Sequence, residues 1–197
     1  MFSLIFFVLL TFFLLSRLNA ILGMRVGFTI DKEEIQGHFN DVEEVQTSDI
    51  DKMVSRLQKI DKNFQLNDFK NKAQKVFGIV FTAYANEDKK TLEALLSKRI
   101  YNAFVMAIND RQKRGEKLCG EIVRFISIEV VDIQIENTKC SICVKFETEQ
   151  SNVLRNRQGD VIEGDLNYVQ NRTDIWLFGK DFSSRDRVWY LEEIKSE

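Results

Sequence analysis

The spacing of the apolar residues changes near the middle of this 197-residue chain, and that change restricts the fold more than any other feature. From residue 49 to residue 115, apolar side chains recur every three or four positions, which is the period of an α-helix. After residue 120 they alternate with polar side chains, as in a half-buried β-strand. Helices followed by consecutive strands predict an α+β domain, in which the helices pack on a bent antiparallel sheet.

The helical part divides at its breaks in periodicity and at its capping residues. The first helix is expected to begin at Asp49, and the second to occupy about residues 69–85. A short third helix carries a cluster of leucines at 92–96. Ser97 is a candidate N-cap for the fourth helix, and Gly115 is expected to end it in the left-handed conformation. The charged residues 110–117 are interpreted as a solvated helix end, with a basic docking patch as the alternative.

The strand-like part contains four segments separated by turn-forming residues. These segments are residues 121–136, 140–154, 169–181 and 188–194, with turns at 156–160 and 183–186. In the first segment the alternation shifts phase near residues 128–131, as a β-bulge would produce. A bent sheet over helices often leaves an apolar pocket. The aromatic residues expected to line it are Phe77, Phe81, Tyr84, Tyr101, Phe104, Trp176 and Phe178.

The first 23 residues are expected to form a transmembrane anchor. Residues 2–15 carry no charge, and residues 16–22 extend the run to the length of about 20 that a membrane-spanning helix needs. The anchor residues are Phe2, Phe6, Phe7, Phe12, Phe13 and Arg17, and the arginine would extend its guanidinium to the headgroups. Because the nearby charges all follow the run, the body is expected in the cytoplasm. A cleaved signal peptide with a periplasmic body is the alternative.

An acidic linker is expected between this anchor and the domain. Residues 24–48 contain several carboxylates and few large apolar side chains, so they cannot bury enough surface to offset the entropy of ordering. The domain is then assigned to residues 49–197. Over the whole chain, 28 basic residues nearly balance 30 acidic ones, which argues against nucleic acid as the main partner.

No group of residues has the spacing of a catalytic or metal site, so a non-enzymatic protein without a cofactor or metal is expected. Cys140 and Cys143 form a CxxC inside a predicted strand, where residues three apart point to opposite faces, and they are interpreted as ordinary strand cysteines. The single histidine, His38, lies in the linker. Asp174 beside Trp176 is the candidate acid if the pocket belongs to an enzyme, and Arg185 and Asp186 before Trp189 would complete the acid–base set.

Two blocks of the sequence resemble the Tim44-like domain family. The first is residues 86–97 leading into Tyr101; the second is residues 173–178, followed by residues 184–186 and Trp189. The resemblance covers about residues 50–197 and is looser over the anchor. It implies a cystatin/NTF2-like fold with a large apolar pocket, and a role at the inner membrane in protein translocation or membrane-complex biogenesis. The implied partners are an Hsp70-type chaperone or a translocase subunit, or a lipid in the pocket.

Two other functions stay open at this point. The domain could be a small-molecule enzyme or carrier, as NTF2-like isomerases are. It could also anchor ribosomes at the membrane, as the resemblance to a mitochondrial ribosomal member of the family implies. Residues 69–197 carry 21 basic and 20 acidic side chains, and this weak net charge argues mildly against an RNA-binding surface.

Overall fold

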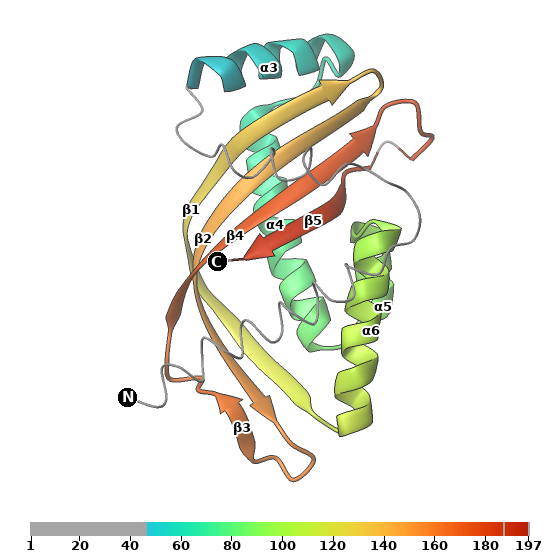
Figure 1. Cartoon of the computed structure of the whole chain (residues 1–197). Coiled ribbons are helices and arrows are strands. Elements are labelled where there is room, and N and C mark those ends of the chain that lie inside the picture. The colour runs from blue at the N-terminus through green and yellow to red at the C-terminus, as the bar shows by residue number, and fades with distance from the viewer. Residues whose placement is uncertain (1–46, 187, 197) are drawn as a thin grey trace, which may run out of the picture. The chain divides into compact units, whose positions relative to one another are not determined.

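The computed structural model describes residues 47–186 and 188–196, in which helices precede strands (Figure 1). The helices are α3 (Thr47–Ile60), α4 (Leu66–Ala85), α5 (Lys89–Leu95) and α6 (Lys98–Arg114). The strands are β1 (Lys117–Glu136), β2 (Lys139–Arg155), β3 (Val161–Gly164), β4 (Gln170–Asp181) and β5 (Tyr190–Ser196). The strands pair antiparallel in a single sheet, so the expected α+β class is confirmed for the described residues.

The strand order is β1-β2-β4-β5, and β3 pairs with the end of β2 that β4 does not reach. The sequence did not predict β3. This strand has only four residues, and its two apolar side chains, Val161 and Ile162, are 49% and 45% exposed. Because neither face of β3 is buried, the segment has no alternation that could indicate a strand.

Helix α4 packs its apolar side against the sheet and forms the centre of the core. Phe77 of α4 stacks on Trp176 of β4 with ring centroids 4.5 Å apart, and Phe146 of β2 lies 4.8 Å from Phe77. On β2 the side chains of Ile142, Val144 and Phe146 alternate into this core, with no measurable exposure. The period-two pattern predicted for β2 is therefore the pattern of its buried face.

Strand β1 contains three β-bulges. Its pairing with β2 skips Val123, Ile126 and Val131, so each of these is an extra residue without an opposite partner. In a regular strand, inward-facing side chains are two residues apart. At each bulge the extra residue increases this spacing to three. The phase shift expected near residues 128–131 is confirmed at Val131, whereas the other two bulges were not predicted.

Three helix ends show how local capping residues begin and end the helices. Gly115 ends α6 with φ of 69°, as expected, and the amide of Gly115 donates to the carbonyl of Gln112. The amide of Asp88 donates to the carbonyl of Ala83 at the end of α4, and the Asp88 carboxylate then caps α5 by accepting from the Thr91 amide. Ser97 occupies the N-cap position of α6, but its hydroxyl makes no capping hydrogen bond.

The predicted anchor and most of the predicted linker lie outside the described residues. Phe2, Phe6, Phe7, Phe12, Phe13, Arg17 and His38 belong to that part of the chain, so the predictions for them stay predictions. Helix α3 begins at Thr47, two residues before the expected start of the domain. Among the helices that the structure describes, none combines the length and hydrophobicity needed to span a membrane.

Candidate functional site

The aromatic residues predicted to line a pocket lie mainly in the core or between helices. Phe77, Trp176 and Phe178 are 2%, 5% and 2% exposed, and the Trp176 ring contacts the rings of both phenylalanines. Tyr84 and Phe104 join α4 to α6 with an edge-to-face contact at 5.0 Å. The remaining two, Phe81 and Tyr101, are half-buried. A binding role for these seven residues stays a prediction.

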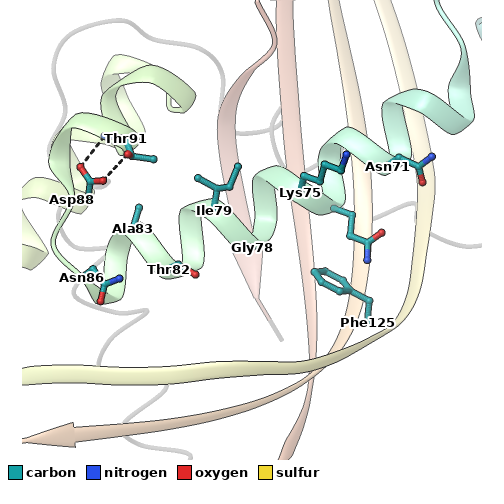
Figure 2. Close-up of a pocket in the computed structure, with 11 residues that line it drawn as sticks. Asn71, Lys75, Gly78, Ile79, Thr82, Ala83, Asn86, Asp88, Thr91 and Phe125 are labelled. Carbon is teal, nitrogen blue, oxygen red and sulfur yellow. Dashed lines mark hydrogen bonds between the residues drawn. The ribbon is translucent and has the colours of Figure 1, made fainter.

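A groove of about 950 Å³ lies along α4, and none of these seven aromatic residues lines it (Figure 2). We call it the α4 groove. One wall is the exposed side of α4, and Phe125 of β1 lies on the other side of it. Its lining residues are Asn71, Gln74, Lys75, Gly78, Ile79, Thr82, Ala83, Asn86, Asp88, Thr91 and Phe125.

The α4 groove offers hydrogen-bonding groups in place of the expected aromatic lining. The side chains of Asn71, Gln74, Thr82 and Asn86 make no hydrogen bond to any described residue. Asp88, at one end, accepts from the amide and the hydroxyl of Thr91 at 3.1 and 2.6 Å, and these bonds lower the pKa of its carboxyl. Asp88 therefore stays ionised near neutral pH. These side chains fit a partner that offers hydrogen-bonding groups better than they fit proton transfer.

The end of the α4 groove is held in place by Arg111, a residue that we expected at a solvated helix end (residues 110–117). That expectation is wrong for Arg111, which is only 4% exposed. Its guanidinium donates to the carbonyl of Tyr84 at 2.8 Å and lies 4.7 Å from the centre of the Tyr84 ring. Its Nε lies 3.6 Å from a carboxylate oxygen of Glu87, in the turn between α4 and α5.

Glu87 needs this support because its backbone has φ of 62°, a conformation that residues other than glycine and asparagine rarely adopt. Gln112 also donates a hydrogen bond to the Glu87 carboxylate. A signal for the burial of Arg111 was present in the sequence. The arginine follows Ile100, Phe104 and Ile108 at helical spacing, so it continues the buried stripe of α6.

The sequence that forms this domain matches a known family. The model of the Tim44-like domain matches residues 50–196. The chain belongs to the Tim44-like domain family.

Two relatives illustrate the range of the Tim44-like domain family. The large ribosomal subunit protein mL45 of Drosophila melanogaster is 25% identical over 71% of this chain, and the alignment covers 39% of that protein. The probable mitochondrial import inner membrane translocase subunit tin-44 of Caenorhabditis elegans is 20% identical over 75% of this chain and covers 36% of its own length. This chain therefore spans well under half of either relative.

A solved structure with a similar arrangement is the intermembrane space region of the chloroplast protein ARC6. It is 14% identical to this chain, with a TM-score of 0.48. The alignment covers 68% of this chain and 97% of the solved one.

Asp174, the candidate acid, lies in a polar layer of this Tim44-like domain. It is 8% exposed, and the side-chain amide of Gln150 lies 3.5 Å from its carboxylate. Gln150 also donates to the hydroxyl of Thr148 at 2.8 Å. Asp186, which with Arg185 completed the acid–base hypothesis, lies in the exposed turn after β4. The structure therefore places Asp174 in a buried strand and Asp186 at the surface.

The two cysteines of the CxxC point to opposite faces of β2, as predicted, yet both are buried. Cys140 and Cys143 are 1% and 7% exposed, and burial raises the pKa of each thiol to about 12. Cys119 of the Tim44-like domain is more accessible.

We expect iodoacetamide at pH 8 to alkylate Cys119 in the folded protein, because the thiolate is the reactive form. Cys140 and Cys143 should react at least about a hundredfold more slowly until denaturant is added. Mass spectrometry of the alkylated peptides measures all three rates, and Cys119→Ser is the control that removes the fast phase. Equal rates for the three thiols in the folded protein would contradict this interpretation.

Proposed function

We propose that this protein is a non-enzymatic adaptor attached to the inner membrane, whose Tim44-like domain binds a partner polypeptide during protein translocation or membrane-complex biogenesis. The observation that carries the proposal is the family match over residues 50–196, together with a translocase subunit among the relatives. The uncharged run at residues 2–15 supports membrane attachment. The α4 groove, with its unused side-chain amides and hydroxyl, supports binding.

The proposal includes a single-pass anchor with the domain on the cytoplasmic side. The absence of charge before Arg17 favours this orientation under the positive-inside rule. Protease added to sealed vesicles of each orientation tests it. The domain should be digested only where the cytoplasmic side faces outwards, and digestion in the opposite vesicles would overturn the orientation.

The function itself is tested by crosslinking in intact membranes, followed by purification of the full chain and quantitative mass spectrometry. A translocase subunit, a membrane chaperone or a subunit of a membrane complex should be enriched at least tenfold. The matched control keeps residues 1–46 and carries an unrelated soluble domain in place of residues 47–197. Equal recovery of every such protein with the control would refute the adaptor function.

The relative mL45 is a ribosomal protein, and this observation favours one second candidate function, the anchoring of ribosomes at the membrane. Cosedimentation of the detergent-solubilised full chain with ribosomes distinguishes the two functions. The adaptor proposal expects the chain to stay in the supernatant at physiological salt. Stoichiometric cosedimentation would favour the ribosomal function.

A further inference from the structure

We propose that the α4 groove binds an extended polypeptide segment, and that the main chain of this segment approaches α4 most closely at Gly78. The inference rests on the proposed function, because it specifies how the Tim44-like domain would hold its partner. It is carried by three features of the groove: its length, the chemistry of its lining, and a glycine that the fold does not require.

The length of the α4 groove corresponds to a short peptide. Its lining residues along α4 run from Asn71 to Asn86, the C-cap of this helix, and at 1.5 Å per residue this wall is about 22 Å long. A β-like strand rises about 3.3 Å per residue, so roughly seven extended residues fill it.

The lining chemistry matches the main chain of an extended peptide. The side-chain amides of Asn71, Gln74 and Asn86 can each donate and accept hydrogen bonds, and so can the hydroxyl of Thr82. An extended peptide presents unpaired N–H and C=O groups that such side chains can satisfy, whereas a helix satisfies its own. An acyl chain would cover these amides without pairing them, which is unfavourable. These amide and hydroxyl groups therefore favour an extended polypeptide over a helix or a lipid tail.

Gly78 is unexplained by the fold alone. A Cβ placed on it would meet no atom within 4 Å, so no neighbouring residue excludes a side chain there. It is also absent from the residues with positive φ, so its backbone does not require glycine. Glycine is unfavourable in a helix interior, because it adds conformational entropy to the unfolded chain. What it provides at this position is open space at the middle of the α4 groove, where a second main chain can approach closely.

The charges of the α4 groove give the bound segment a direction. Lys75 is exposed and makes no ion pair with any described residue, and Lys72 lies one turn before it on the same helix. Asp88 is the ionised carboxylate at the opposite end. Ile79, which is 45% exposed between them, offers an apolar contact. We therefore expect the segment to carry an acidic side chain near Lys75, an apolar one near Ile79 and a basic one near Asp88.

The test starts from the full chain in detergent micelles and a phage-displayed library of random 12-residue peptides. Peptides are selected on the wild-type chain and counter-selected on the Gly78→Trp chain. We expect them to share the acidic–apolar–basic order, and to bind Gly78→Trp at least tenfold more weakly in fluorescence anisotropy. Met106→Trp is the matched control, because Met106 lies on α6, is 45% exposed and is outside the groove. This variant should bind the peptides as tightly as the wild type.

A second variant distinguishes a peptide ligand from a lipid ligand, because it should lower the affinity for the peptide but not for the lipid. Gln74→Leu combined with Thr82→Val removes two hydrogen-bonding groups and makes the groove more apolar. Peptide affinity should fall at least fivefold in this variant. A fluorescent fatty acid such as cis-parinaric acid should bind it no more weakly than the wild type, and Gly78→Trp should not change that binding.

The inference would be overturned if no selected peptide bound the wild type more tightly than Gly78→Trp. It would also be overturned if the wild type bound the fatty acid and Gly78→Trp abolished that binding. These failures are separable from failure of the proposed function. If membrane crosslinking recovers the same partner with wild type and Gly78→Trp, the adaptor function stands and the α4 groove is not its binding site. If wild type recovers no partner, the proposed function itself fails.

Discussion

Replacing Trp176 by aspartate should unfold the domain at room temperature. Trp176 is 5% exposed, and its ring contacts those of Phe77, Phe146 and Phe178 at centroid distances of 4.5, 5.6 and 6.1 Å. Truncating a buried tryptophan costs about 3–5 kcal/mol, and an unpaired buried carboxylate adds several kcal/mol. The total reaches the whole stability of an ordinary domain, about 5–15 kcal/mol.

Circular dichroism on heating measures this effect. Met106→Asp is the matched control, because Met106 lies on α6 with 45% of its surface exposed, and its melting temperature should change by only a few degrees. A Trp176→Asp variant that melts at the wild-type temperature would show that the aromatic cluster is not the core. Replacing Phe81 by aspartate should lower the free energy of unfolding by less, because Phe81 is only half-buried.

Replacing Arg111 by methionine should lower the free energy of unfolding by about 3 kcal/mol, the lower end of what removing one partner of a buried ion pair costs. The variant loses the hydrogen bond to the Tyr84 carbonyl and the ion pair with Glu87. It also leaves the left-handed backbone of Glu87 with less support. We expect the α4–α5 turn to loosen first, since Arg111 joins it to α6.

Urea denaturation compares Arg111→Met with Lys113→Met, which removes an exposed positive charge from the same helix end and should cost under about 0.5 kcal/mol. Adding Glu87→Gln should recover part of the loss, because the carboxylate no longer needs a counter-charge. Equal stabilities of Arg111→Met and Lys113→Met would mean that the buried arginine is not a structural link.

The sequence predicted those parts of the fold that depend on local rules. Gly115 ended its helix as expected, and the turn at residues 156–160 forms because the side chain of Asn156 accepts from two following amides. Strand β2 buries every second side chain from Cys140 to Gln150, with Cys143 buried in addition on the other face. In each case the determining interaction lies within a few residues of sequence.

What the sequence did not predict depends on contacts between distant segments. Arg111 is buried because the turn at Glu87, 24 positions earlier, supplies a carboxylate and places the Tyr84 carbonyl within its reach. The α4 groove lies beside the exposed flank of α4, and its polar residues resemble those of any solvated helix face. The aromatic residues were assigned to a pocket because composition cannot show whether large rings line a hollow or fill it.

The three bulges of β1 also affect whether copies of this protein can associate through the edges of their sheets. β1 is an outer strand of the sheet, and an outer strand with a regular row of free amides and carbonyls would recruit the same strand of a neighbour. Val123, Ile126 and Val131 interrupt that row, so two such strands cannot align over more than a few residues. Copies of the domain at high local concentration would thus avoid polymerising through their sheets.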